Sequence, residues 1–433
     1  MPHADELDRA VDEARRRYAQ RRPETAALHE RATRVMPGGN TRTVLYHRPF
    51  PLRVARAWDA VLEDVDGHRY VDLLGEYSAG LYGHSHPVVL EAMREAIAEG
   101  LSRGAHTERE VLLADAVCAR WPSIERVRFT NSGTEANLMA LSAARVFTGR
   151  DRVVVFRGGY HGGLLTFAHG ASPVNAPYDV LVADFNDADA ARDLLRAHAD
   201  QVACVLVEPM LGSAGCLPAD PGFLQALREI TAGTGALLVF DEVMTSRIGA
   251  GGLQQHYGVR PDLTTLGKYV GGGSSFGAFG GRADVMSLFD PTRSDALPHA
   301  GTFNNNVISM AAGHAGLTRV YPPEVAEAHT RRGDELRHRL AEALDGAPFC
   351  VTGLGSLMAL HATSGPVRRL EDLHDADPRR LELLFLDLLE RGVYLAPRGY
   401  LALSLAVTDS QLDGFVDAVA DAVRGRSSLF AHR

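Results

Sequence analysis

The sequence predicts an α/β fold, with a mostly parallel sheet in a large domain and a smaller α+β domain formed by both ends of the chain. Short apolar runs, each the length of one strand, alternate with segments of helical spacing through the middle of the chain. After residue 348 the runs alternate in polarity between further helices, which indicates an α+β arrangement. We expect an N-terminal helix, a loop and small-domain strands in residues 1–75, the large domain in residues 76–320, and the rest of the small domain in residues 321–433.

Composition excludes several classes of protein. The chain has 433 residues, of which 45% are hydrophobic and 23% charged, an ordinary balance for a globular protein with a large core. A net charge of −9 argues against nucleic acid and anionic membrane surfaces as partners. No apolar run approaches the ~20 residues that span a bilayer, and the N-terminus lacks the segments of a secretory signal, so we expect a cytoplasmic protein.

We expect no metal site. The four cysteines are scattered along the chain without a CxxC motif, which favours reduced thiols over disulfides or zinc. His84 and His86 lie in a glycine- and aromatic-rich loop over residues 76–87. No partner stands at ligand spacing from them, so we interpret both as polar loop residues.

The N-terminal part begins with helices and continues into strands. Residues 4–36 carry helical spacing and many charges, which predicts one or two amphipathic helices. A Pro-Gly-Gly turn breaks that pattern, and the following loop ends at Arg42, which by default would be a solvated arginine. Residues 52–73 alternate apolar and polar side chains around an Asp66-Gly67 turn, which predicts an antiparallel meander.

A strand, a glycine turn and a helix follow one another after residue 125. Residues 127–129 read as the strand, the turn contains Ser132 and Gly133, and the helix begins at about Thr134. A helix N-terminus after a glycine turn presents unpaired backbone N–H groups to an anion. A simple N-cap is the alternative interpretation.

Further strand-like runs alternate with helical segments, which is the pattern of βαβ units. They occupy residues 152–156, 179–182, 202–208, 236–240 and 263–266. The glycine loop at residues 158–163 carries Tyr160, an aromatic side chain able to lie on a planar cofactor; a surface tyrosine on a plain turn is the alternative. The third run ends in an acid, Glu208.

Two neighbouring strand ends carry the residues around which the chain is organised. The run at 236–240 leads into Asp241, and the run at 263–266 leads to Lys268, next to glycines 271–273 that we expect to be flexible. Ligands of open α/β sheets bind at the carboxyl ends of the strands. An acid and a lysine there favour pyridoxal phosphate (PLP), held by the lysine amine, with the acid keeping its pyridine nitrogen protonated. A surface ion pair is the alternative.

The C-terminal third returns to mixed elements. A polar loop covers residues 298–306 and precedes a helix rich in alanine and glycine. We predict helices at 325–345, 378–391 and 409–425, and strands at 349–354, 356–361, 393–396 and 400–405.

Together these motifs resemble the class III aminotransferases, PLP enzymes of fold type I, from Pro37 to about Leu405. The strings that carry the resemblance are Phe129-Thr-Asn-Ser-Gly-Thr-Glu-Ala, Gly159-Tyr-His-Gly, Val239-Phe-Asp-Glu-Val-Met-Thr-Ser-Arg and Leu263-Thr-Thr-Leu-Gly-Lys. They are similar to both the glutamate-1-semialdehyde aminomutases and the β-amino-acid aminotransferases of this family.

The resemblance implies the roles of the two reactive groups and of the phosphate site. Lys268 holds the cofactor and later moves the proton. Asp241 pairs with the pyridine nitrogen, and Ser132, Gly133 and Thr134 hold the phosphate.

The resemblance also implies the surroundings of the cofactor ring. Tyr160 stacks on one face, Val243 packs on the other, and Glu208 orders the hydrogen bonds beside the ring. Family members build their sites across a homodimer, so Thr302 is expected to reach the phosphate of the neighbouring subunit.

The loops that contact substrate resemble the β-phenylalanine aminotransferases more than the aminomutases. After position 302 the aminomutase pattern reads roughly Leu-Ser-Gly-Asn-Pro, whereas this chain has Phe-Asn-Asn-Asn-Val. The strings at 37–46, 271–280 and 397–399 favour the first group. That resemblance implies that Arg42 binds the substrate carboxylate and that Arg398 binds a second one, as on 2-oxoglutarate.

The side-chain pocket and the reaction follow from the same resemblance. Val44, Tyr77 and Tyr82 are expected to wall an aromatic pocket. The leading hypothesis is transfer of the amino group of a β-amino acid, such as β-phenylalanine, to a keto acid such as 2-oxoglutarate or pyruvate. Intramolecular amino transfer of the aminomutase type is the alternative, and a non-catalytic PLP-fold protein is a third.

Overall fold

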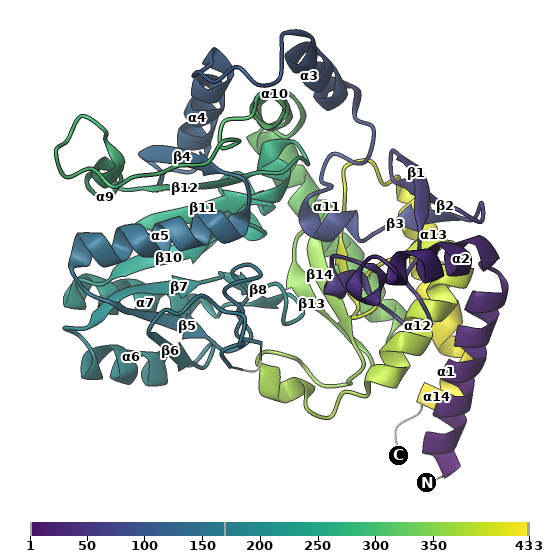
Figure 1. Cartoon of the computed structure of the whole chain (residues 1–433). Helices are drawn as coiled ribbons and strands as arrows, with labels where there is room; N and C mark the ends of the chain where they lie inside the picture. The colour runs from purple at the N-terminus through teal and green to yellow at the C-terminus, as the bar shows by residue number, and fades with distance from the viewer. Residues whose placement is uncertain (1, 169, 431–433) are drawn as a thin grey trace. The chain divides into compact units, whose positions relative to one another are not determined.

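The computed structural model describes residues 2–168 and 170–430 (Figure 1). The chain divides into two compact units. The first unit combines Met1–His86 with Arg332–Val367 and Glu371–Arg433, and the second combines Pro87–Arg331 with Arg368–Leu370. The predicted domain boundaries after residues 75 and 320 stay predictions.

The second unit contains a seven-stranded sheet in the order β4-β12-β11-β10-β7-β5-β6. Its strands are β4 (Arg126–Thr130), β5 (Arg152–Phe156), β6 (Val180–Ala183), β7 (Val202–Val207), β10 (Leu237–Asp241), β11 (Leu263–Gly267) and β12 (Gly277–Gly281). Strand β12 is antiparallel to both of its neighbours, and every other pair is parallel. The predicted mostly parallel sheet is therefore confirmed.

Strand β12 is the element of this sheet that the sequence pattern did not predict. Three of its five residues are glycine, which disfavours a strand. The structure supplies the reason, because neighbouring backbones pass too close for a side chain. A Cβ on Gly277 would lie 2.1 Å from the Ser132 carbonyl oxygen, and one on Gly281 would lie 2.1 Å from that of Asp262.

Helices cover both faces of this sheet. Helix α5 (Gly133–Thr148) packs on one face, where its Ala140 shares a core with Val155 and Leu206. Helix α7 (Pro221–Thr234) packs on the other face, where the Phe223 and Phe156 rings meet with centroids 5.2 Å apart. Val155 and Phe156 are successive residues of one strand, so their side chains point to opposite faces.

The other elements of the second unit are shorter or lie outside the sheet. They are α3 (Pro87–Ala98), α4 (Glu108–Arg120), α6 (Ala188–Ala197), α8 (Gly252–Tyr257), α9 (Ala283–Met286), α10 (Val307–Ala315), β8 (Met210–Leu211) and β9 (Leu217–Pro218). Helix α11 (Pro323–Ala343) carries the chain from the second unit into the first.

The first unit joins strands from both ends of the chain, as predicted. Strands β1 (Val54–Trp58), β2 (Val61–Asp64) and β3 (Arg69–Asp72) form the antiparallel meander, and β15 (Val393–Tyr394) pairs with β3. A second sheet has the order β13-β14-β16, from β13 (Cys350–Leu354), β14 (Leu357–His361) and β16 (Tyr400–Ala402).

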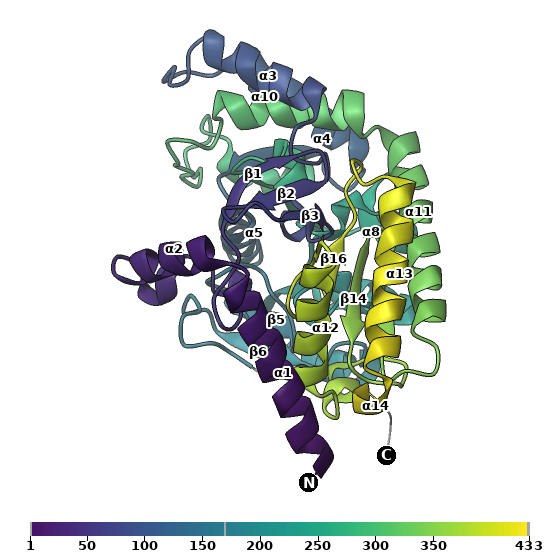
Figure 2. The same ribbon diagram turned by 90° about the vertical axis from the view of Figure 1, so that its right-hand side faces the viewer.

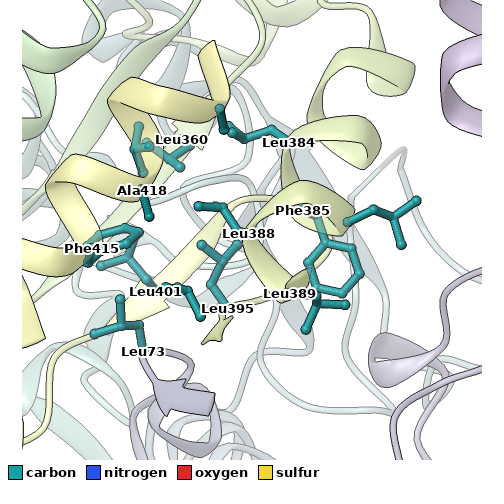
Figure 3. Packing of buried hydrophobic residues seen from close by; sticks show 14 of the residues in the cluster. Leu73, Leu360, Leu384, Phe385, Leu388, Leu389, Leu395, Leu401, Phe415 and Ala418 are labelled. Carbon is teal, nitrogen blue, oxygen red and sulfur yellow. The ribbon is translucent and has the colours of Figure 1, made fainter. Parts of the chain in front are cut away.

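The core of the first unit forms where helices pack beside these sheets (Figure 2). The helices are α1 (Pro2–Gln20), α2 (Pro23–Thr33), α12 (Pro378–Glu390), α13 (Asp409–Gly425) and α14 (Ser427–Phe430). Figure 3 shows Leu388 of α12 among Leu395, Leu401 and Phe415, all of them buried. Burying each such side chain contributes about 1.5–3 kcal/mol. Within residues 2–168 and 170–430, every helix is too short or too polar to cross a bilayer.

Candidate active site

The residues predicted to hold the cofactor follow the carboxyl ends of parallel strands. Strand β4 leads to Ser132, β5 to Tyr160, β7 to Glu208, β10 to Asp241 and β11 to Lys268. Strands β10 and β11 are direct neighbours, with Asp241 level with Thr265. The prediction of an acid and a lysine on adjacent strand ends is therefore confirmed. We call this region of the second unit the carboxyl edge.

Asp241 is a buried carboxylate with hydrogen-bond partners on both oxygens. The Asn137 side-chain amide donates to Oδ2 over 2.8 Å, and His161 Nδ1 lies 2.8 Å from the same oxygen. The Val243 backbone N–H donates to Oδ1 over 3.0 Å. Behind them, the Thr265 hydroxyl donates to Asn137 Oδ1 over 2.8 Å. This network fixes the carboxylate in one orientation.

Lys268 occupies an unusual backbone conformation. Its φ of 56° lies in the left-handed region, which costs a non-glycine residue about 1–3 kcal/mol. Lys268 is also the only lysine in the chain, among many arginines. An arginine cannot lose its proton in a protein, whereas a lysine amine can and can then react with a carbonyl. The only lysine of the chain therefore lies at the strand end where a reactive amine is predicted.

Two of the three glycines after Lys268 that were predicted to be flexible are closely packed. A Cβ on Gly271 would lie 2.2 Å from Phe276 Cβ, and one on Gly272 would lie 2.3 Å from Ala312 Cβ. Gly271 and Gly272 are buried and closely packed, because glycine here allows neighbouring chain segments to approach, whereas Gly273 is exposed. The first two glycines after Lys268 are thus held in place.

The predicted anion site falls on the first turn of helix α5, and its phosphate-binding role stays a prediction. Ser132 is the N-cap of this helix, and the Ser132 hydroxyl accepts a hydrogen bond from the Glu135 N–H over 3.2 Å. A simple N-cap does not exclude the predicted anion site, because the first turn of a helix has backbone N–H groups without intrahelical partners at the positive end of its dipole.

Other parts of the carboxyl edge meet this turn. A Cβ on Gly133 would lie 2.9 Å from Val243 Cγ2, and a Cβ on Gly267 would lie 3.1 Å from Val243 Cγ1. A Cβ on Gly162 would lie 2.1 Å from Thr134 Oγ1, so the Tyr160 loop also reaches the turn. Val243 therefore lies between the anion site and the residue before Lys268.

Glu208 is buried and holds the Tyr160 loop. Its Oε1 accepts a hydrogen bond from the Tyr160 N–H over 2.8 Å, and its Oε2 accepts one from the Gly212 N–H over 3.0 Å. Burial raises the pKa of Glu208 to about 7; the nearby His161 opposes this shift and the Asp241 carboxylate adds to it. The Tyr160 side chain is 48% exposed.

These observations fit PLP. A flat pyridine ring that carries a phosphate needs a carboxylate for its nitrogen, an amine for its aldehyde, an anion site and two covering side chains. The carboxyl edge supplies Asp241, Lys268, the first turn of α5, and Val243 and Tyr160. These individual assignments stay predictions.

Thr302 lies on an exposed turn. Its neighbour Asn304 accepts a hydrogen bond from the Asn131 amide over 2.9 Å, which ties this turn to the residue before Ser132. The expected contact of Thr302 with a neighbouring subunit stays a prediction.

The residues predicted to contact substrate lie in the first unit, and three of them, Arg42, Arg398 and Val44, meet a fourth, Tyr77. The Arg398 and Arg42 guanidinium carbons lie 5.3 and 5.9 Å from the Tyr77 ring centroid. The Tyr77 hydroxyl donates to the Val44 carbonyl over 3.0 Å. Tyr82, five residues after Tyr77, is buried, with 3% of its surface exposed. A pocket walled by Val44, Tyr77 and Tyr82 stays a prediction.

Two groups of residues escaped the sequence analysis. Asn137 and His161 form hydrogen bonds to Asp241. The sequence could have indicated both, since Asn137 follows Gly133 by four residues on one helix face and His161 directly follows Tyr160. Glu76 forms an ion pair with Arg42, and no sequence signal indicated it.

The fold and the carboxyl edge define a PLP-dependent transferase of fold type I. The family model described as "Aminotransferase class-III" matches residues 45–423. The chain therefore belongs to the class III aminotransferases and is a PLP-dependent transaminase.

Individual relatives match along nearly the full chain. A β-phenylalanine transaminase from Variovorax paradoxus is 52% identical over 431 residues, which cover 99% of each protein. A crystal structure of a β-phenylalanine aminotransferase from the same organism superimposes with a TM-score of 0.97, covering 98% of this chain and 99% of the other. A glutamate-1-semialdehyde 2,1-aminomutase from Sorangium cellulosum is 40% identical over 415 residues, covering 91% of this chain and 94% of the other.

Proposed function

We propose that this enzyme transfers the amino group of a β-amino acid, with β-phenylalanine as the model substrate, to a keto acid such as 2-oxoglutarate. The observation that carries the proposal is the pair of guanidinium groups, Arg42 and Arg398, on one tyrosine ring. A guanidinium binds a carboxylate through two parallel hydrogen bonds. Two such groups suit a donor with one carboxylate and an acceptor with two. The 52% identical β-phenylalanine transaminase supports the same substrate class.

Each reactive group has a defined task in this proposal. PLP, when bound, accepts the electron pair released when the amine-bearing carbon of the substrate loses its proton. Lys268 Nζ takes that proton from the donor carbon and, in the second half-reaction, delivers a proton to the former carbonyl carbon of the acceptor. Asp241 holds a proton on the ring nitrogen through charge and a hydrogen bond, and Asn137 and His161 keep its carboxylate oriented.

The remaining residues bind and orient. The N–H groups of Gly133 and Thr134, with the Ser132 and Thr134 hydroxyls, hold the phosphate. Tyr160 and Val243 cover the two ring faces, and Glu208 orders the Tyr160 loop. Arg42 binds the carboxylate of the β-amino acid, and Arg398 binds the second carboxylate of the acceptor.

We infer further that the enzyme works as a homodimer in the cytoplasm. The exposed Thr302 turn, bonded through Asn304 to the residue before the phosphate turn, is suitably placed to serve a partner's phosphate site. The four cysteines, all in the part of the chain that is described, carry no disulfide, in keeping with a reducing compartment. Sedimentation of the holoenzyme tests the dimer, and a Thr302→Ala variant that keeps its PLP affinity would contradict the shared site.

The second candidate is intramolecular amino transfer, which the 40% identical aminomutase supports. The two reactions differ in their need for an external acceptor. Purified holoenzyme is incubated with β-phenylalanine, with and without 2-oxoglutarate, and separately with glutamate-1-semialdehyde alone. We expect glutamate to form only when β-phenylalanine and 2-oxoglutarate are both present. Turnover of the semialdehyde without acceptor, and none of β-phenylalanine, would favour the aminomutase.

A further inference from the structure

Four consecutive residues of the first unit adopt left-handed backbone conformations. The φ angles are 53° at Gly75, 50° at Glu76, 52° at Tyr77 and 76° at Ser78. Left-handed conformations are unfavourable for residues with a side chain, and a run of three such residues is rare. Strain of this kind persists only where the surrounding structure enforces it, and it concentrates at functional sites.

The surroundings of this turn hold it in place. The Asp72 carboxylate accepts hydrogen bonds from the N–H groups of Leu74 and Gly75, over 2.9 and 3.1 Å. Gly75 fits only because it lacks a side chain, since a Cβ there would lie 2.6 Å from the Ala402 carbonyl oxygen. The Tyr77 ring stacks on Tyr400, with centroids 5.4 Å apart and an interplanar angle of 23°.

The turn delivers two side chains to the predicted carboxylate-binding arginines. Glu76 forms an ion pair with Arg42, and the Tyr77 ring contacts the guanidinium groups of both Arg42 and Arg398. The side chains of Arg42 and Glu76 are 43% and 54% exposed, so the pair is open to exchange with a carboxylate from solution. We call Arg42, Glu76, Tyr77 and Arg398 the arginine cluster.

A plain surface ion pair looks different in this chain. Glu30 of α2 and Arg34, the C-cap residue directly after that helix, are exposed and paired four residues apart, where near-helical backbone brings them together. Glu76 instead reaches Arg42 from a strained turn, 34 residues along the chain. The fold therefore maintains an unfavourable conformation that holds a carboxylate against the arginine predicted to bind substrate.

We propose that Glu76 is an internal counter-ion that occupies Arg42 until the carboxylate of the substrate displaces it, which makes Glu76 a specificity-determining residue. The inference rests on the proposed function, because it takes Arg42 as the carboxylate site. The incoming carboxylate accepts hydrogen bonds from the same Arg42 guanidinium N–H groups that pair with Glu76. Substrate binding is therefore an exchange of one carboxylate for another. The exchange weakens binding of every ligand that places a carboxylate on Arg42 and leaves ligands without a carboxylate unaffected.

The test uses an unreactive probe. 3-Phenylpropanoate has the carbon skeleton of β-phenylalanine without its amine, and 3-phenylpropan-1-ol is the matched probe without a charge. Inhibition constants for both are measured on holoenzyme against β-phenylalanine turnover. The variants are Glu76→Gln, Glu76→Ala and the matched control Glu30→Gln, with the PLP absorbance of each confirming its fold.

We expect both Glu76 variants to lower the inhibition constant of 3-phenylpropanoate about threefold, the scale of an exposed ion pair. We expect the inhibition constant of 3-phenylpropan-1-ol to stay unchanged. We expect KM for β-phenylalanine to fall as the inhibition constant of 3-phenylpropanoate does, while kcat stays near the wild-type value. Glu30→Gln is expected to match the wild type. An unchanged or raised constant for 3-phenylpropanoate in both Glu76 variants would overturn the proposal.

Arg42→Ala separates this proposal from the function on which it rests. If Arg42→Ala binds 3-phenylpropanoate as tightly as the wild type, the carboxylate site has been assigned wrongly, and the counter-ion proposal fails together with that assignment, while glutamate formation tests the reaction itself. If Arg42→Ala weakens binding but the Glu76 variants do not strengthen it, the counter-ion proposal fails alone. In the double variant Arg42→Ala/Glu76→Gln, we expect the Glu76 effect to disappear.

Discussion

The carboxyl edge of the second unit and the arginine cluster of the first unit handle carboxylates in opposite ways. Asp241 at the carboxyl edge is 5% exposed, and fixed neighbours donate to both of its oxygens. Glu76 in the arginine cluster is 54% exposed and has an ion-pair partner that a ligand can take. Under the proposed function this difference is a division of tasks, in which the groups assigned to the reacting atoms are immobilised and the groups assigned to substrate recognition stay exchangeable.

The two regions share one feature, which is backbone strain at residues with a proposed role. Lys268 has a φ of 56°, and Glu76 and Tyr77 have φ values of 50° and 52°. Elsewhere among the described residues, only a handful of non-glycine positions have positive φ. Strain held in place by the fold is therefore a marker of both regions, although their chemistry differs.

The largest effect is expected from Lys268→Ala, because it removes the proposed proton carrier. We expect turnover to fall by at least ~10³-fold, within the range of general acid–base contributions. Borohydride reduction of wild-type holoenzyme, followed by peptide mass analysis, should place one cofactor on the peptide containing Lys268, the only lysine. Attachment to the N-terminal amine, or labelling that persists in Lys268→Ala, would contradict the assignment.

A slightly smaller loss is expected from Asp241→Asn, because the ring nitrogen then loses its charged partner. We expect kcat to fall roughly 10²- to 10³-fold. Asp262→Asn is the matched control, since Asp262 is also 5% exposed but precedes β11 at the opposite end of the strand and pairs with Arg228. Asp262→Asn should change thermal stability and leave kcat near the wild-type value. Equal losses of kcat in Asp241→Asn and Asp262→Asn would contradict a special role for Asp241.

The arginine cluster should respond in KM more than in kcat. For Arg42→Ala we expect KM for β-phenylalanine to rise roughly 10- to 100-fold, the worth of a charge-assisted hydrogen-bonded pair. For Arg398→Ala the rise should fall mainly on 2-oxoglutarate. Arg56→Ala, which removes an exposed arginine paired with Glu63, is the control. A loss of kcat at unchanged KM would place Arg42 with the immobilised groups and remove the contrast between the two regions.

The smallest effect concerns the pH dependence of stability at Glu208. Its pKa is raised in the folded protein to about 7 from a usual value of 4.5, so between these values the folded state holds a proton that the unfolded state has released. Glu208 therefore makes stability decrease as pH rises through that window. Glu208→Gln should reduce the fall in melting temperature between pH 5 and pH 8. Parallel pH profiles for the two proteins would contradict the raised pKa.

The sequence predicted the carboxyl edge far better than the arginine cluster, for physical reasons. Buried parallel strands need continuous apolar runs, so the strands that end at Asp241 and Lys268 could be located directly. Strand β12 was missed because backbone contact there requires glycine. The left-handed turn at Gly75–Ser78 depends on Asp72, Ala402 and Tyr400, which are close only after folding. No local pattern at Glu76 could reveal it.

The most direct test of the account is a half-reaction. Holoenzyme is mixed with excess β-phenylalanine in the absence of a keto acid, and the PLP absorbance is followed. We predict that the band is lost with formation of one keto-acid product per active site, and that 2-oxoglutarate then restores the band with release of one glutamate. An absorbance that does not change with β-phenylalanine, in a protein that carries bound PLP, would contradict the proposed function.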